Sequence, residues 1–413
     1  MLIFVHSAYL SKVSGVFLME VAKRLKSIPP YVFAEIGKKA QALADTGVDI
    51  INLGIGAPDQ PTFRHIVDAM HEAIEKPINH KYPPFGGTPE FKEAAAKWVN
   101  ERFKINIDPK TEITSLIGGK EGIHHLIMAY VDQGDYALIP DPAYPVYQSS
   151  TMLAGGTPHF MPLLPENGFL PDFDQIPDEV AKKAKIMLLN YPNNPTAAVA
   201  DLKFFEKAVQ YCKKHDILLC HDLAYSEMTF DGYKAPSIFN VKGAKDIAIE
   251  LHTLSKSFNM TGWRVGFAIG NAEAVSNLAK IKSNIDTDVF RAIQVASIAA
   301  FEGPRDQIEH CNDLYIQRRD LAVKRLTELG WKVEPIKATF YMWLPVPPGM
   351  TSEEFSNQML NVAGIVVPPG NAYGPSGEGY FRLSLCLGAD RMAEAFDRMA
   401  KHSINFEMGK AKI

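Results

Sequence analysis

The chain has 413 residues, of which 46% are hydrophobic and 22% are charged. This length suggests two or three domains' worth of material, and the composition is ordinary for a globular protein, which excludes a disordered or fibrous chain. The formal net charge is −4 and like charges form no long run, so neither nucleic acid nor a membrane surface is an expected partner.

The start of the chain carries little structural signal. Residues 1–18 lack the basic and uninterrupted apolar pattern of a signal peptide, and we expect a loose N-terminal arm that precedes a start at Met19. No apolar run reaches the roughly 18–20 residues that span a bilayer. Without Cys-x-x-Cys spacing, the cysteines are expected to be reduced core thiols of a cytoplasmic protein: Cys212, Cys220, Cys311 and Cys386.

From about residue 50 to residue 300, short β-rich runs alternate with longer helical patterns, as over 88–103 and 201–215. This alternation predicts an α/β domain with a mostly parallel sheet that is covered by helices. Several runs are nearly continuous in Val, Ile and Leu, as expected of strands buried on both faces. The expected strands are 113–117, 136–139, 186–190, 217–221, 249–252 and 265–269.

The end of the chain follows another pattern. A long helical stretch over 307–330 precedes strand-like segments at 331–344, 364–367 and 380–385, and a last helix begins at Asp390. This order predicts a second, smaller α+β unit.

The polar residues that follow each strand are the candidates for a site, because ligands of open α/β sheets bind beyond the carboxyl ends of the strands. Gly118-Gly119-Lys120 lies between a strand and a helix, where backbone N–H groups and the helix dipole can bind an anion, although glycine turns of this kind are common. Tyr144 and Tyr147 lie in a proline-stiffened loop, which by itself is more simply a packed turn.

Two further strands end in polar motifs. Asn193-Asn194-Pro195 predicts a tight turn, with a cis bond at Pro195 and an amide aimed at the mouth of the sheet. His221-Asp222-Leu-Ala-Tyr225 places a carboxylate and a phenol three residues apart, and a buried carboxylate there needs a partner. His221, taken singly, is interpreted as a core histidine.

The most informative segment is HTLSKSFNMTGWRVG, in which Lys256 directly follows an apolar strand. An ammonium is costly to bury there, so either the side chain reaches solvent or its surroundings lower its pKa for chemistry. The hydroxyls of Thr253 and Ser255 and the guanidinium of Arg264 are close in sequence. This mixture suits a phosphate dianion beside a reactive amine.

These motifs, together with PDPAYPVY, PNNPT, HDLAY and FRLS, occur in the order found in fold-type I pyridoxal-phosphate (PLP) aminotransferases of class I/II, and the chain resembles that family beyond residue 20. LGIGAPDQPT, KYPPFGG and KSNIDTDVFRAIQ are most similar to bacterial LL-diaminopimelate and aspartate/alanine aminotransferases. The resemblance implies a seven-stranded sheet in a large PLP-binding domain over 61–300, and a small domain over 19–60 and 301–413 that closes on substrate.

The resemblance also implies residue roles. Lys256 would bind the cofactor covalently and move the proton, and Asp222 would face the pyridine nitrogen of the cofactor. Tyr225 and Asn194 would bind its phenolic oxygen, and Asn194 is also a candidate for substrate binding. Gly56 and Arg382 would bind the substrate α-carboxylate. Tyr144 would stack on the ring, and the phosphate would be held by Gly119, Lys120, Thr253, Ser255 and Arg264, with Tyr82 reaching over from the partner in a homodimer.

The expected activity is a ping-pong transamination between an L-amino acid and a 2-oxo acid, with LL-diaminopimelate or aspartate/alanine and 2-oxoglutarate as candidate substrates, and no metal is expected. The alternatives are a PLP-dependent β-lyase or cyclising lyase, and a non-catalytic PLP-binding interaction protein. Four residues are candidate selectors of the donor, each with a solvent-facing alternative: Lys120, Asn284, Asp288 and Arg291.

Three positions depart from the family pattern. Ala197 replaces a frequent glycine, which should alter only a turn. Asp288 adds a negative charge near the expected entrance, where it could repel an acidic side chain, attract a distal ammonium, or cap the helix that starts near Val289. Phe85 offers no carboxylate where plant-type diaminopimelate enzymes have one, so this substrate is not assured.

Overall fold

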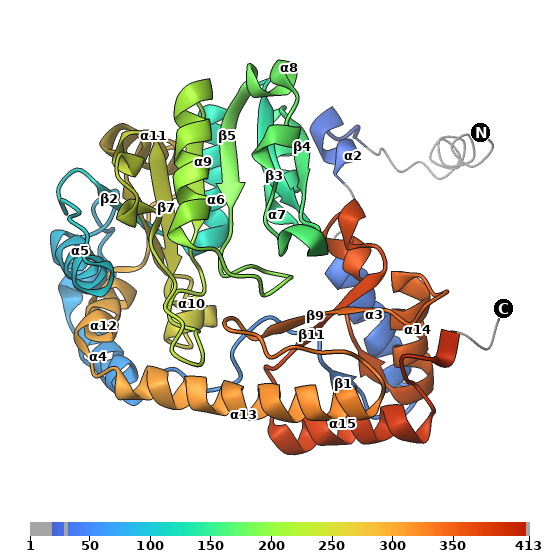
Figure 1. Ribbon diagram of the computed structural model, residues 1–413. Helices are drawn as coiled ribbons and strands as arrows, with labels where there is room; N and C mark the ends of the chain where they lie inside the picture. Colours follow the sequence, from blue (N-terminus) through green and yellow to red (C-terminus); the bar gives the residue numbers. More distant parts are fainter. Residues whose placement is uncertain (1–18, 29–31, 410–413) are drawn as a thin grey trace.

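The computed structural model describes residues 19–28 and 32–409, so the expected arm at 1–18 lies outside the described residues. A seven-stranded sheet in the order β2-β8-β7-β6-β5-β3-β4 forms the centre of the molecule (Figure 1). Its strands are β2 Ile113–Leu116, β3 Tyr136–Asp141, β4 Thr157–Pro162, β5 Ala184–Leu189, β6 Leu218–Asp222, β7 Ala248–Thr253 and β8 Gly266–Gly270.

The sheet is parallel except at β8, which pairs antiparallel with both β2 and β7. The mostly parallel seven-stranded sheet is therefore confirmed. Within β5, Ile186 and Leu188 join one buried cluster while Met187 and Leu189 join another. Because successive side chains of a strand point to opposite faces, the continuous apolar run covers both faces of this strand, as predicted.

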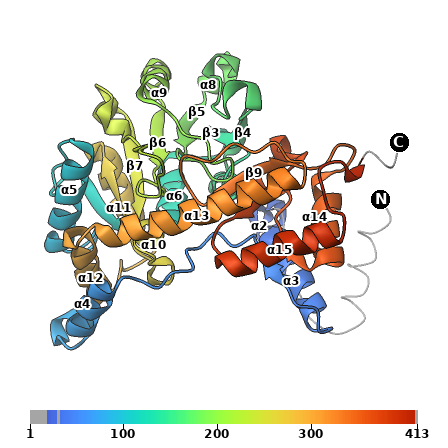
Figure 2. The same ribbon diagram turned by 60° about the horizontal axis from the view of Figure 1, so that its bottom comes forward.

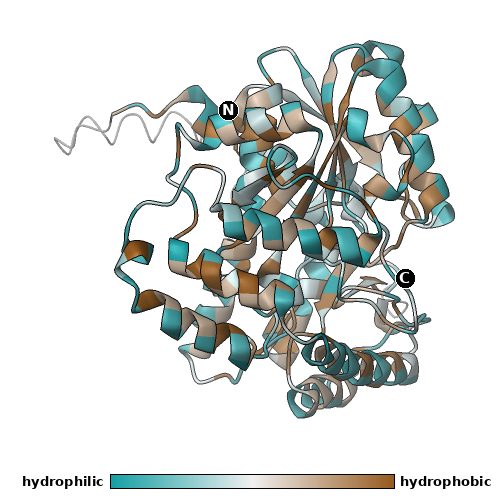
Figure 3. Ribbon diagram, turned by 90° about the vertical axis from the view of Figure 1, so that its left-hand side faces the viewer, coloured by the Kyte–Doolittle hydropathy of each residue, from teal (hydrophilic) through white to brown (hydrophobic). Residues whose placement is uncertain are grey.

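Helices cover the two faces. Helices α6 (Gly119–Tyr130), α7 (Val146–Ala154) and α11 (Ala272–Lys282) pack on the face of Ile186, and α9 (Leu202–His215) packs on the face of Met187. The outer helices carry hydrophilic stretches while the central strands are hydrophobic, as Figure 3 shows. The start of α9 is fixed by its cap, since the Asp201 carboxylate accepts a hydrogen bond of 2.9 Å from the Phe204 amide.

Other helices flank the β2 edge of the sheet or lie at its ends. Helix α12 (Arg291–Glu302) packs against both α4 (Arg64–Ile74) and α5 (Pro89–Phe103). Short helices lie at Lys23–Ser27 (α2), Asp178–Ala181 (α8) and Leu254–Ser257 (α10). Helix α13 (Asp306–Glu328) runs from the α12 side towards α15 (Ala389–Lys401), as Figures 1 and 2 show.

The remaining elements form a second cluster. Strands β9 (Tyr341–Pro345) and β11 (Tyr380–Ser384) pair antiparallel, and β1 (Ile51–Asn52) pairs parallel with β10 (Ile365–Val366). Helices α3 (Val32–Ala44), α14 (Ser352–Ala363) and α15 lie beside these strands. The strand β1 therefore lies among the C-terminal elements, whereas α2, near the start of the described residues, contacts α7 of the large sheet.

The structure corrects two expectations about strands. Residues 331–340 are irregular, so the strand expected over 331–344 begins only at Tyr341, and Trp331 is instead buried in the core with its indole donating to the Pro345 carbonyl at 2.9 Å. Strand β4 was not expected, because Pro158 and Pro162 remove amide donors. It lies at the sheet edge, where proline is tolerated.

All four cysteines are free, as predicted, and three of them are buried in the core. Cys311 is only partly buried, so the expectation of a core thiol is wrong at this position. Within the described residues, no helix is both long enough and apolar enough to cross a membrane.

Candidate active site

A cavity of about 450 Å³ opens beyond the carboxyl ends of the central strands, between the large sheet and the cluster of terminal elements. Its wall contains, apart from Tyr82, every residue expected to bind the cofactor or the substrate α-carboxylate: Gly56, Gly119, Lys120, Tyr144, Asn194, Asp222, Tyr225, Thr253, Ser255, Lys256, Arg264 and Arg382. Residues that are far apart in sequence thus converge at the place where ligands of open α/β sheets bind.

Lys256 lies on α10, the short helix that directly follows β7 and is capped by Thr253. Its Nζ donates a hydrogen bond of 2.5 Å to the Gly56 carbonyl. The pKa of Lys256 is lowered to about 8, chiefly by burial; the positive charges of Arg382 and Arg264 act in the same direction, and Cys386 and Asp222 oppose the shift. The amine is therefore uncharged at a pH where an ordinary lysine is protonated, which makes it a nucleophile and a proton acceptor.

Asp222 ends strand β6 and is 7% exposed. Burial raises the pKa of its carboxyl group, while the hydroxyl of Tyr147, which donates to Asp222 Oδ2 at 2.8 Å, acts in the opposite direction. The Asn190 side chain donates to the Asp222 backbone carbonyl at 2.7 Å. Asp222 is thus held rigidly on the cavity wall, and Tyr147, which sequence analysis left as a packed aromatic, is its hydrogen-bond donor.

Arg382 on β11 is surrounded by aromatic rings. Its guanidinium carbon lies 4.0 Å from the ring centre of Tyr341 and 5.0 Å from that of Tyr373. It donates to Asn194 Oδ1 at 2.9 Å and to the Gly54 carbonyl at 2.7 Å, whereas its buried Nε has no partner within the described part of the chain. A buried cation with an unused donor on a cavity wall is suited to a carboxylate ligand.

The first turn of α6 and Arg264 form another part of the wall. Gly118 precedes this helix with φ +80°, and a Cβ atom there would lie 2.3 Å from Nη2 of Arg264. The missing side chain therefore lets the guanidinium lie against the helix start, where the amides of Gly119 and Lys120 begin α6. On the facing β7–α10 connection, Thr253 Oγ1 donates to Ser255 Oγ at 3.0 Å.

Tyr225 extends the polar wall, since its hydroxyl donates to that of Tyr341 at 3.3 Å. Burial raises the pKa of Tyr225 well above its ordinary value. Close packing also explains Gly56, where a Cβ atom would lie 2.3 Å from the Tyr341 hydroxyl oxygen. Tyr341 was hidden from sequence analysis inside a segment that was assigned only as a strand.

Other wall residues came from segments without an obvious chemical motif. Helix α3 contributes Phe33, Ile36 and Gly37, and Tyr373 also lies on the wall. An apolar helix face and single aromatic residues carry no signal that separates a site from a core, so the sequence offered no means of finding them.

Several expectations about single residues can now be judged. The Asn194-Pro195 bond is cis, as predicted. His221 is fully buried with both ring nitrogens in hydrogen bonds, to Glu250 and to the Tyr191 carbonyl, which confirms a core histidine. Ala197 has φ +60°, a conformation that explains why glycine suits this turn.

Asp288 does not belong to the cavity wall. Its carboxylate accepts hydrogen bonds from the amides of Gly86 and Val289 and from the Ser115 hydroxyl. The interpretation as a charge at the entrance is thus wrong, and the capping interpretation holds only for the Val289 amide, since α12 begins at Arg291. Asn284 is exposed and donates to the Lys280 carbonyl, and among the four candidate selectors only Lys120 is on the wall.

Tyr82 lies outside the cavity with 82% of its side chain exposed, and Phe85 is 61% exposed. Both belong to the loop before α5, whose end is held by the bond between the Gly86 amide and Asp288 at 2.7 Å.

The cavity wall fits pyridoxal phosphate. The cofactor requires an uncharged amine, a carboxylate for its ring nitrogen and an anion site for its phosphate. The wall supplies a buried amine of lowered pKa at Lys256, a buried carboxylate at Asp222, and a guanidinium against a helix start at Arg264.

Comparison with known proteins agrees with this geometry. Residues 48–399 match the family model described as aminotransferase class I and II. An LL-diaminopimelate aminotransferase 2 of Trichormus variabilis is 57% identical over 94% of this chain and 100% of its own, and an LL-diaminopimelate aminotransferase of Moorella thermoacetica is 49% identical over 93% and 98%.

Solved structures are also similar. Apo-BacF from Bacillus subtilis superposes with a TM-score of 0.91 at 38% identity, covering 94% of this chain and 100% of its own. A single mutant of Thermus thermophilus aspartate aminotransferase has a TM-score of 0.87 at 28% identity, covering 93% and 100%. With its matching family model, full-length relatives and fold, the chain belongs to the class I and II aminotransferases, enzymes that use pyridoxal phosphate.

Proposed function

We propose that this enzyme transfers the amino group of LL-diaminopimelate to 2-oxoglutarate. The observation that carries the choice of donor is the 57% identity, over the full length of the relative, to a protein named for that donor. The choice of acceptor is an inference from the reaction class alone. When bound, PLP provides the electron sink for the proton loss at Cα, and the residues of this chain hold the reactants and move the proton.

Lys256 is proposed as the residue that binds the cofactor covalently and then carries the proton. The uncharged amine suits both tasks, because the substrate amine would displace Lys256 from the cofactor and leave it beside the substrate, where it can act as a base.

Asp222 is proposed to face the pyridine nitrogen and keep it protonated, with Tyr147 orienting the carboxylate. Tyr144 would stack on the ring, and Tyr225 and Asn194 would bind its phenolic oxygen.

Arg382 is proposed to bind the α-carboxylate of the substrate. Its guanidinium can exchange the Asn194 contact or use its free Nε for a carboxylate oxygen, and Gly56 lies next to Tyr341 on the same side of the cavity. The surrounding aromatic rings exclude water, which strengthens a charge-assisted hydrogen bond.

We infer a phosphate site at Gly119, Lys120, Thr253, Ser255 and Arg264, completed in a homodimer by Tyr82 of the partner subunit. The support for the contribution of a partner subunit is the exposure of Tyr82 and Phe85 on a loop whose end is held by the bond between the Gly86 amide and Asp288. Tyr and Phe are enriched at protein–protein interfaces, so two exposed aromatic residues on one anchored loop favour a contact with another chain.

We further propose a small domain over 19–60 and 301–413, a large domain over 61–300, and a cytoplasmic location. The pairing of β1 with β10 supports the division, because it joins a segment before residue 60 to one after residue 301. The free, buried cysteines support a reducing compartment.

A panel of amino donors tests the proposal. The purified enzyme is incubated with one amino donor at a time: LL-diaminopimelate, aspartate, alanine or glutamate. 2-Oxoglutarate is the acceptor for every donor except glutamate, whose product it is. We expect kcat/KM to be highest for LL-diaminopimelate. A preference for aspartate or alanine would contradict the proposed donor, and continuous release of ammonia or pyruvate without an acceptor would point to a lyase instead.

A further inference from the structure

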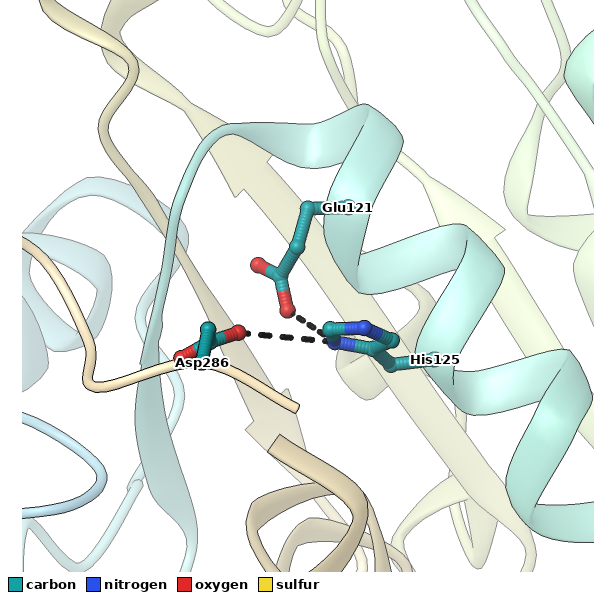
Figure 4. Close-up of side chains that lie close together, drawn as sticks. All are labelled: Glu121, His125 and Asp286. Carbon is teal, nitrogen blue, oxygen red and sulfur yellow. Dashed lines mark hydrogen bonds and ion pairs between the residues drawn. The ribbon is translucent and has the colours of Figure 1, made fainter. Parts of the chain in front are cut away.

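A buried charged cluster lies behind the first turn of α6. Glu121 and His125 are one helical turn apart on α6, and Asp286 approaches them from the loop after α11, as Figure 4 shows. Their ligand atoms lie within 4.8 Å of one another, a spacing that could suit a metal ion. The position for a cation is already taken, however, because Lys282 Nζ lies 3.0 Å from Glu121 Oε1 and 3.2 Å from Asp286 Oδ2.

Lys282 is the last residue of α11, and only 2% of its side chain is exposed. A buried ammonium persists only where carboxylates compensate its charge. The two carboxylates lie on different segments of the chain. Lys282 therefore joins α6 to the loop at 283–290, together with His125, whose Nδ1 lies against Glu121 and 3.7 Å from Asp286. Removal of Lys282 would leave the two carboxylates without their shared ammonium.

The pair between Lys282 and Glu121 is connected to the cavity wall through the start of α6. Glu121 lies in the first turn of α6, next to Gly119 and Lys120, and its other carboxylate oxygen accepts the amide of Ile117 at 2.7 Å. Glu121 thus fixes the connection between β2 and α6 that contains Gly118. The position of the helix start relative to Arg264 depends on this connection.

The pair between Lys282 and Asp286 is connected through Asp288 to the loop that carries Tyr82. Asp286 Oδ1 accepts the amide of Asp288 at 2.8 Å, and Asp288 accepts the Gly86 amide at 2.7 Å. Asp288 has φ +73°, a conformation that is rare for residues other than glycine and that these bonds maintain. A continuous chain of contacts therefore runs from the start of α6 through Lys282 to the end of the loop at 81–87.

We propose that Lys282 is a positioning residue for the cofactor phosphate, acting through Glu121 on the helix start and through Asp286 and Asp288 on the loop of Tyr82. The inference rests on the proposed phosphate site at Gly119, Lys120 and Arg264. Lys282 itself touches neither cofactor nor substrate. Its effect is to keep the donors that face the phosphate at fixed positions.

The test compares binding of PLP and of pyridoxal, which lacks the phosphate, to the apoprotein. We expect Lys282→Met to weaken PLP binding at least tenfold and pyridoxal binding much less, so that the preference for PLP falls. Lys282→Arg should recover much of this preference, because it keeps the positive charge. The control is Lys245→Met, which breaks a lysine–carboxylate pair with Glu112 outside the cavity and should leave both affinities unchanged.

The outcomes distinguish a wrong phosphate site from a wrong role for Lys282. If the wild-type protein does not prefer PLP over pyridoxal, the proposed phosphate site is wrong, and the inference with it. If the wild type shows the preference and Lys282→Met keeps it, only the role of Lys282 is refuted. If Lys282→Met does not fold, Asp286→Asn provides the same comparison. This variant weakens the pair between Lys282 and Asp286 but leaves the ammonium with Glu121. An unchanged preference for PLP in Asp286→Asn would also refute the role of Lys282.

Discussion

The proposed chemistry depends on the amine of Lys256, and the lowered pKa of this amine leads to a pH prediction. Because the charged form is disfavoured by burial, the amine loses its proton near pH 8 rather than near 10.5. Covalent capture of pyridoxal by the apoprotein should therefore speed up as the pH rises and level off above about 8. Stopped-flow absorbance measures the rate, and a midpoint near 10 would contradict the pKa shift.

Replacement of Lys256 by alanine should abolish both covalent binding and turnover. Loss of proton transfer alone costs about 10²- to 10⁴-fold in rate. Intact mass after borohydride reduction should show cofactor attached to the wild type and not to the variant. Turnover that stays within tenfold of the wild type would exclude Lys256 from the role proposed for it.

Arg382 should affect all donors alike. Arg382→Ala removes a charged hydrogen-bond donor, a loss of about 1.5–3 kcal/mol, or roughly 10- to 100-fold in kcat/KM. The decrease should have a similar size for every α-amino acid, because all share the α-carboxylate. Kinetics with a series of donors checks this, and an effect confined to one side-chain type would instead place Arg382 at the distal end of the substrate.

At the scale of elements, the connection between β2 and α6 provides a matched pair of glycines. Gly118 and Gly134 both have positive φ, +80° and +95°, but only at Gly118 would a Cβ atom meet Arg264. Either alanine variant should lose about 1–2 kcal/mol of stability from its backbone conformation. Only Gly118→Ala should also weaken PLP binding, as a titration of the apoproteins would show. Equal PLP affinity in the two variants would mean that the close approach of Arg264 has no part in binding.

The sequence predicts elements well where one pattern dominates. Buried strands such as β5 follow from continuous apolar runs, and α9 follows from its cap and its amphipathic spacing. Strand β4 escaped because its two prolines argue against a strand unless the sheet edge is known. The segment at 331–340 has the apolar residues of a strand, but they pack individually into the core, which only the tertiary structure reveals.

The candidate site also contains residues that the sequence predicted and residues that it did not. Residues at strand ends with distinctive chemistry, such as Lys256 and Asp222, could be found because the fold class fixes where strand ends meet. Asp288 was misjudged, since its hydrogen bonds to Gly86 and Ser115 join positions about 200 and 170 residues away in sequence. Tyr147 was interpreted as a packed aromatic residue of a turn, and no role was assigned to Lys282, because the roles of both arise from partners on other elements.

For the whole molecule, the proposed homodimer predicts complementation between two defective variants. Lys256→Ala damages the site of its own subunit, whereas Tyr82→Ala should damage that of the partner. A mixed dimer would then contain one intact site, so a random mixture of the two inactive proteins should regain about a quarter of the wild-type sites. Activity assays after refolding of the mixture measure this, and each variant refolded alone is the control. If Tyr82→Ala is inactive and mixing restores nothing, the sites are not shared.

The hydrogen bond between Lys256 and the Gly56 carbonyl links the state of the amine to the segment that follows β1. One nitrogen cannot keep this bond unchanged while it is joined to another molecule. If Lys256 binds the cofactor as proposed, its binding would free a backbone oxygen on the segment that connects β1 to α4. The mobility of residues near Gly56, followed by hydrogen exchange, should thus report whether the lysine is engaged, even before any amino acid arrives.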